Sequence, residues 1–173
     1  MNLRSARPAF AAFCLAFAAA QAFAAEPAEP SPQLLQEITA SLQKAGGTVF
    51  PVGCANSAAN AAHFTGKSFV AGLGGDANLR VANVTFEPGS VNWWHVHPKS
   101  CQVLFAVSGR GYVQIWGQAP VELKPGVTFT VPANTKHWHG AAKDSWFQHV
   151  AAMTPSNTVW IEPVDQAEYA KLP

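Results

Sequence analysis

The sequence predicts an all-β fold, a barrel or sandwich of many short strands with one short helix before it and another after it. Two observations carry this prediction. From Lys67 onward, short runs rich in Val, Phe, Trp and Thr follow one another. Glycine and proline turn signals, such as Gly74-Gly75, Pro88-Gly89 and Pro125-Gly126, separate these runs. Many short strands at such spacing are typical of barrels and sandwiches.

The first segment, residues 1–24, has the pattern of a secretory signal peptide. Arg4 and Arg7 give it a positive start, residues 9–20 are apolar and uncharged, and residues 22–24 form a small-x-small cleavage site. The apolar run is too short for a membrane-spanning helix, although an uncleaved N-terminal anchor is the alternative. We therefore expect a periplasmic or secreted protein.

Residues 25–66 are expected to form an N-terminal linker, helix and arm. Ser31 and Pro32 give the N-cap and the first position of a helix that runs to about Lys44, with apolar residues at helical spacing. Gly46-Gly47 ends this helix. The segment after it, rich in small residues, reads as a loop or arm that could cross to a neighbouring subunit.

Residues 67–173 are expected to form the barrel and a C-terminal helix, for which Asp165 is the N-cap. The β-prone runs are residues 67–73, 79–87, 91–97, 101–108, 111–117, 121–124, 127–132, 136–141, 145–153 and 160–164.

Composition excludes some function classes. Loss of Arg4 and Arg7 with the signal peptide would leave 9 of the 11 basic residues beside 10 acidic ones, a net charge near −1. Such a balance does not favour nucleic acid or a membrane surface as a partner. Cys54 and Cys101 would remain in an oxidising compartment, either as a disulfide or as two separate thiols.

Four of the six histidines form two His-x-His pairs, His95 with His97 and His137 with His139. Alternate residues of a strand share a face, so each pair points one way, and Gln102 lies on a third strand. If these strands are neighbours, imidazoles and an amide converge in the barrel. Neutral imidazoles suit first-row transition metals, and three or four protein ligands leave positions open for catalysis.

The order of these residues resembles the two signature motifs of the cupin family. Residues 89–109 read G-x5-H-x-H-x4-Q-x6-G, and residues 126–137 read G-x5-P-x-N-x2-H. The resemblance implies a double-stranded β-helix, a jelly-roll-like barrel, that holds one divalent metal. Its ligands would be His95, His97, Gln102 and His137. The usual glutamate is replaced by Gln102, and the usual glycine of the second motif by Asn134.

The phrases NVTFEPGS, WHVHP, KHWHGAAKDSWFQH and WIEPVDQAEY are similar to a bacterial cupin subgroup that includes hydroxynitrile lyases. This resemblance implies glutamine as a normal fourth ligand and Mn(II) as the usual metal, with Fe(II) or Zn(II) as alternatives. Three histidines and a glutamine leave the charge of the ion uncompensated, which makes it a stronger Lewis acid. That favours acid–base or lyase chemistry over dioxygenation.

The same resemblance assigns catalytic roles to His139 and His149, with His139 as the first choice for the base. It lies roughly 6–7 Å from His137 along the strand, too far to be a ligand of the same kind. Either histidine could instead orient a metal ligand through a hydrogen bond. His63 reads as a structural or surface residue.

Tryptophans and phenylalanines are concentrated around the motifs. The inward-facing ones could line an apolar pocket for a small aromatic or carbonyl compound, or they could be plain core residues. By parity, Trp94 and Trp138 point outward, against the other sheet or a partner chain. The family resemblance implies a homo-oligomer, a dimer or tetramer. Two other function classes stay open, a metal-dependent dioxygenase or other oxidoreductase and a non-enzymatic small-ligand-binding protein.

Overall fold

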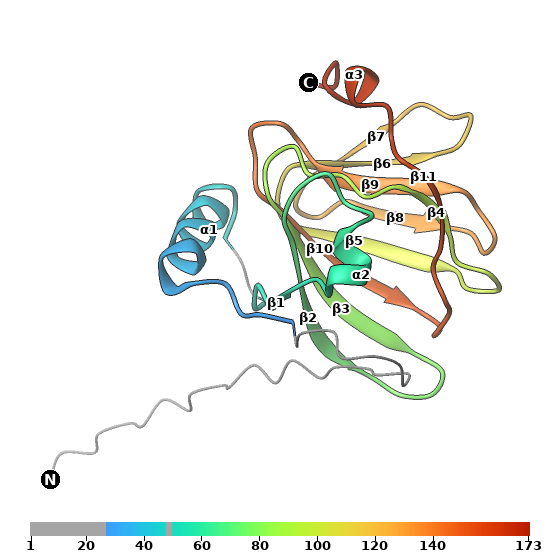
Figure 1. Ribbon diagram of the computed structural model, residues 1–173, viewed down its shortest axis with the longest axis horizontal. Coiled ribbons are helices and arrows are strands. Elements are labelled where there is room, and N and C mark those ends of the chain that lie inside the picture. Colours follow the sequence, from blue (N-terminus) through green and yellow to red (C-terminus); the bar gives the residue numbers. More distant parts are fainter. Residues whose placement is uncertain (1–26, 48–49) are drawn as a thin grey trace, which may run out of the picture.

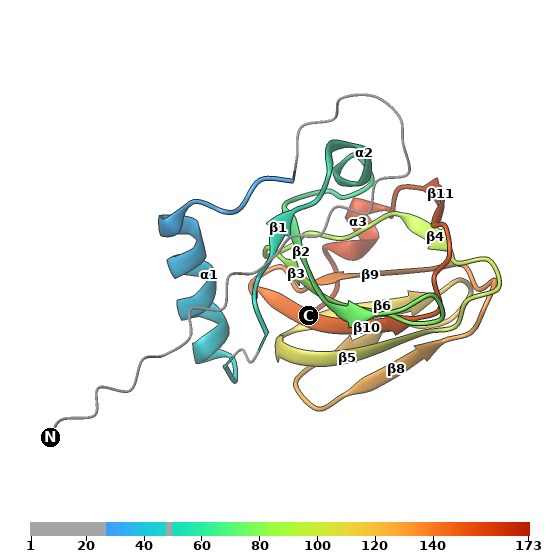
Figure 2. The same cartoon turned by 90° about the horizontal axis from the view of Figure 1, so that it is seen from below.

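Two antiparallel β-sheets face each other in the computed structural model, which describes residues 27–47 and 50–173 (Figures 1 and 2). The predicted signal peptide lies outside the described residues. The first sheet has the strand order β1-β2-β3-β10-β5-β8, and the second has the order β11-β4-β9-β6-β7. The strands are β1 Cys54–Ala55, β2 Ser68–Gly75, β3 Arg80–Phe86, β4 Trp94–Val96, β5 Gln102–Gly109, β6 Gly111–Ile115, β7 Val121–Leu123, β8 Thr128–Val131, β9 His137–Ala141, β10 Phe147–Met153 and β11 Val159–Glu162.

The main core fills the space between the sheets. Alternate side chains of each strand face inward, which places apolar residues of β3, β5 and β10 opposite those of β6 and β9. The sheets therefore pack as a sandwich that closes into a barrel, as the strand pattern predicts. The buried residues of this core are Phe86, Leu104, Ala106, Val113, Leu123, Val131, Ala141, Phe147 and Ala151.

The first helix, α1 (Pro32–Lys44), has the predicted bounds and covers the outer face of the first sheet. The hydroxyl of Ser31 accepts a hydrogen bond from the Leu34 amide at 3.3 Å, which caps the helix. Ile38 and Leu42 are fully buried, and the Leu42 carbonyl accepts a hydrogen bond from Ser108 of β5 at 2.9 Å. Burial of such side chains stabilises by roughly 1.5–3 kcal/mol each.

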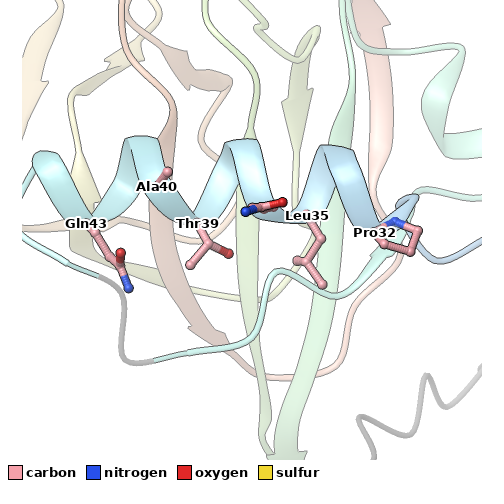
Figure 3. A pocket seen from close by; sticks show the side chains of 6 residues that line it. Pro32, Leu35, Thr39, Ala40 and Gln43 are labelled. Carbon is pink, nitrogen blue, oxygen red and sulfur yellow. The ribbon is translucent and has the colours of Figure 1, made fainter.

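The opposite face of α1 carries a hollow lined by Pro32, Leu35, Gln36, Thr39, Ala40 and Gln43 (Figure 3). None of these side chains is titratable. Because the hollow lies outside the barrel, it is separate from the histidines.

The last helix, α3 (Gln166–Tyr169), covers the outer face of the second sheet (Figure 1). Asp165 caps it as predicted, accepting hydrogen bonds from the amides of Ala167 and Glu168. Tyr169 packs edge-on against Trp138, whose outward direction is thereby confirmed. Trp138 is therefore covered by α3 of the same chain.

The expected arm contains two short elements that the sequence pattern did not reveal, β1 and the helix α2 (Ala58–Ala61). The segment after α2 is joined to the strand region before β4 by a bridge between Phe64 and Asn92. None of the helices in the described ranges is long and apolar enough to cross a membrane. The structure does not test the domain boundaries predicted at residues 24 and 66.

Candidate metal centre

Six polar side chains meet between the two sheets, five of them from strands and His97 from the residue directly after β4. His95 of β4 pairs directly with His137 of β9, and in the first sheet Met153 of β10 pairs with Gln102 of β5. His149 pairs with Ala106 on the same inner face. All six are at most 5% exposed: His95, His97, Gln102, His137, His139 and His149.

Three of the imidazoles form a compact group. Ring nitrogens of His95, His137 and His139 all lie within 4.8 Å of one another, a spacing that fits a metal ion. The rings of His95 and His137 are the closest, with centroids 4.1 Å apart. His97 is close as well, with its centroid 5.0 Å from His95 and 5.4 Å from His137.

Hydrogen bonds fix which nitrogen of two rings points inward. Nδ1 of His95 donates to the Trp93 carbonyl at 2.8 Å, and Nδ1 of His137 donates to the Thr135 carbonyl at 2.9 Å. A neutral imidazole has one N–H, so the Nε2 atom of each ring carries a lone pair. Such carbonyl contacts commonly orient metal-binding histidines.

Two of these groups face each other in a way that calls for a cation. Oε1 of Gln102 lies 3.1 Å from Nε2 of His137, so two lone pairs are directed at one another. The amide nitrogen of Gln102 turns toward the Met153 sulfur at 3.9 Å. In addition, Nε2 of His97 is buried with no hydrogen-bond partner. The donor set therefore fits a bound divalent ion.

The hydrogen bonding also separates His97 from His139. The ring nitrogens of His139 lie close to those of His95 and His137, but its ring is already in contact with two other groups. Nε2 of His149 lies 3.2 Å from its Nδ1, and the amide nitrogen of Asn92 lies 3.2–3.3 Å from its two ring nitrogens. We favour His97 as the third ligand because its nitrogen has no partner, and the predicted ligand set remains a prediction.

Burial keeps these imidazoles neutral. It lowers the pKa of His97 and of His137 to about 4, and that of His149 to about 3. The pKa of His95 and of His139 falls well below the ordinary value for the same main reason, with repulsion from neighbouring histidines adding to it. None of the described Asp, Glu, Lys or Arg side chains is buried, so no protein charge offsets a bound cation.

Asn92 is a site residue that the sequence analysis missed. Its Oδ1 accepts a hydrogen bond from the His139 backbone amide at 3.0 Å, which turns its NH2 group toward the His139 ring. Strict alternation from His95 would point Asn92 away from the barrel. The chain before β4 is irregular and holds only isolated bridges there, which is why alternation failed.

Cys101, next to Gln102, is a free and exposed thiol. A disulfide between Cys54 and Cys101, one of the two states left open by the sequence, is therefore not formed. Because Cys101 is exposed, it is not part of the buried group of histidines and Gln102.

The arrangement can be compared with known proteins. Residues 82–148 match the family described as the cupin domain. A curated relative, the (R)-mandelonitrile lyase of Granulicella tundricola, is 37% identical over 93 residues, which span 52% of this chain and 70% of the relative. The chain belongs to the cupin family.

Solved structures agree with the fold of this cupin. A cupin-like protein from Thermotoga maritima is 33% identical with a TM-score of 0.65, and the match covers 72% of this chain and 96% of that one. A Klebsiella pneumoniae protein with a double-stranded β-helix domain has a TM-score of 0.50 at 18% identity, over 58% of this chain and 88% of that one. The predicted double-stranded β-helix is confirmed.

Proposed function

We propose that this cupin is a metal-dependent lyase of the hydroxynitrile lyase type, which cleaves a cyanohydrin into a carbonyl compound and hydrogen cyanide. The observation that carries the proposal is the division of the buried histidines into two sets. In one set, Nε2 of His97 has no hydrogen-bond partner and Nε2 of His137 faces Oε1 of Gln102. The other set is the pair of His139 and His149, whose ring nitrogens are in contact at 3.2 Å. The name of the Granulicella relative supports the same reaction class.

The first set would hold the ion, which we propose to be Mn(II). Its members are His95, His97, Gln102 and His137, all uncharged. When bound, a divalent ion supplies a Lewis acid that lowers the pKa of an alcohol oxygen beside it. Because no carboxylate joins the set, the ion keeps its full charge for that task.

The second set would move the proton. His139 is neutral because burial lowers its pKa, so a ring nitrogen is free of a proton. The same shift makes His139 a weaker base, so it would accept the hydroxyl proton of a cyanohydrin only because the bound ion lowers the pKa of that hydroxyl. As the C=O bond forms, the C–CN bond breaks and its electron pair leaves with cyanide. Cyanide then takes up the proton that His139 had accepted, and leaves as hydrogen cyanide. The His139–His149 contact at 3.2 Å offers a path for that proton transfer. The reaction is redox-neutral and consumes no further reactant.

Two neighbours would support this step. Asn92 fixes the orientation of the His139 ring through the backbone contact described above. Phe86 packs against the rings of His139 and His149, with centroids 5.7 Å from each, and keeps water from the pair. A dry pocket strengthens the electrostatic interactions on which the proton transfer depends.

The test is benzaldehyde release from mandelonitrile by protein stripped of metal and reloaded with Mn(II), Fe(II) or Zn(II). We expect turnover that depends on the metal, and a loss of at least about 100-fold for His139→Ala. His139→Ala should still retain one metal per chain, whereas His137→Ala should lose it. Absence of turnover in protein holding one metal per chain would contradict the lyase proposal and favour an oxidoreductase or a ligand-binding protein.

Two further proposals rest on the sequence and on family resemblance. The signal-peptide pattern of residues 1–24 supports action in the periplasm or outside the cell. The cupin resemblance supports assembly into a dimer or tetramer around a small-molecule site.

A further inference from the structure

One tryptophan, Trp160, lies against the candidate metal centre from the edge of the second sheet. It pairs in register with His95 across β11 and β4, and residues opposite each other on antiparallel strands direct their side chains to the same face. Since His95 points into the barrel, Trp160 does too. Their ring centroids are 4.9 Å apart.

A second layer of aromatic rings holds Trp160 in place. His63 stacks on the indole with centroids 4.7 Å apart and ring planes 6° from parallel, and Phe64 meets it edge-on at 5.9 Å. His63 is itself fixed, because its Nδ1 donates to the Ala59 carbonyl at 3.1 Å and its carbonyl accepts from the Trp93 amide at 2.9 Å. The indole is therefore part of a rigid wall, and His63 is more than a surface residue.

Partial exposure marks where solvent reaches the interior. The histidines of the centre are at most 5% exposed, whereas Trp160 is only partly buried. On the facing sheet, Val84 and Ala82 are also partly exposed, and they pair with His149 and Ala151 on the inner face. These partly exposed side chains of both sheets are apolar. A substrate that reaches the histidines from the side of Trp160 passes beside the indole.

We propose that Trp160 determines specificity, by limiting the size of the apolar group that an uncharged substrate can place beside His95. This inference rests on the proposed function for the identity of the reacting group. It does not require turnover, because the size limit acts on binding. His63 backs the indole, so its removal would relax the limit to a smaller degree.

The experiment compares two neutral alcohols that differ by one fused ring, benzyl alcohol and 2-naphthylmethanol. Their dissociation constants are measured by calorimetry on metal-loaded and on metal-free protein. In Trp160→Ala we expect the ratio of the two constants to shift at least about 10-fold toward the larger alcohol, with a smaller shift in Trp160→Phe and His63→Ala. Trp116→Ala is the matched control, because Trp116 is 56% exposed and meets the outward-facing Trp94 edge-on.

An unchanged ratio in Trp160→Ala, in protein with wild-type circular dichroism and one metal per chain, would overturn the inference. If Trp160→Ala fails to fold, an unchanged ratio in Trp160→Phe would overturn the inference instead. If the ratio shifts but the protein does not cleave mandelonitrile, the size limit set by Trp160 is supported and the proposed lyase function is contradicted. Cleavage together with a fixed ratio would remove only the size limit.

Discussion

Gln102 explains why the candidate centre differs from a carboxylate-containing cupin site. Its Oε1 points at Nε2 of His137, an arrangement of two acceptors that a shared cation would satisfy. A glutamate in its place would neutralise one unit of the ion's charge. A carboxylate at position 102 should therefore raise the affinity for the metal and weaken the bound ion as a Lewis acid.

Gln102→Glu should bind Mn(II) at least about 10-fold more tightly and cleave mandelonitrile at least about 10-fold more slowly, because the carboxylate adds an attractive charge and weakens the polarisation of the substrate oxygen. Metal affinity is measured by competition with a chelator, and turnover by benzaldehyde release. Gln102→Leu is the control, and it should weaken metal binding. Equal or weaker binding by Gln102→Glu would show that residue 102 does not contact the metal.

At this scale, sequence spacing located the six buried polar residues but not their partners. Two His-x-His pairs on strands are enough to place the imidazoles on inner faces. The role of Asn92 was not predicted because this residue lies in an irregular segment of the chain. The contact of Trp160 with His95 depends on the pairing of two strands 65 residues apart, which no local sequence pattern encodes. Spacing also placed His139 too far from His137 to be a ligand, whereas the ring nitrogens of His95, His137 and His139 lie within 4.8 Å of one another. The preference for His97 as the third ligand rests on hydrogen bonds instead, which spacing does not reveal.

Among the elements, β9 carries His137 and His139 and has a closely packed glycine directly after them. A β-carbon on Gly140 would lie 2.6 Å from the Ser90 carbonyl oxygen and 2.7 Å from Cα of Val91. Backbone cannot yield as a flexible side chain can. The strand approaches its neighbours this closely only with glycine at position 140.

Gly140→Ala should lower the free energy of unfolding by about 1–3 kcal/mol, since the added methyl group forces β9 away from the segment before β4. The same displacement should weaken metal binding, because it moves the two histidines of β9. Urea unfolding and chelator competition measure the two effects. Gly72→Ala is the control, because a β-carbon there meets nothing within 4 Å. Similar stability for both variants would contradict this account.

The elements themselves were mostly predictable. Helix α1 has the predicted bounds because its cap, proline and apolar spacing agree. The strands follow their turn signals. By contrast, β1 with two residues and α2 with four are too short to carry a periodic signal, and tertiary contacts maintain them. The pairing of β4 with β9 was a hypothesis in the sequence and is confirmed by the register of His95 with His137.

For the whole molecule, concentrating five histidines in a dry chamber has a thermodynamic consequence. Folding transfers each ring from water, where its pKa is near 6.5, to a site that disfavours the imidazolium form. The pKa in the folded state falls to about 4 for His97 and His137 and to about 3 for His149. For His95 and His139 it also lies well below the ordinary value.

Metal-free protein should therefore lose stability as the pH falls from about 6.5 toward 4. In that range the unfolded chain binds protons that the folded chain does not, so each histidine lowers the free energy of unfolding by up to about 1.4 kcal/mol per pH unit. Well above pH 6.5, from about pH 8 upward, neither state is protonated to a significant degree and the contribution is constant. Urea unfolding at pH 7, 6 and 5 measures the slope.

A variant isolates one of these contributions. His149→Leu removes one buried imidazole, so its stability should fall with acid less steeply, by up to about 1.4 kcal/mol per pH unit. Stability that stays level between pH 7 and 5 would show that the histidines take up protons equally in the folded and unfolded states. Water would then reach the chamber freely, and the neutral bases on which the proposed proton transfer depends would be lost below pH 6.5.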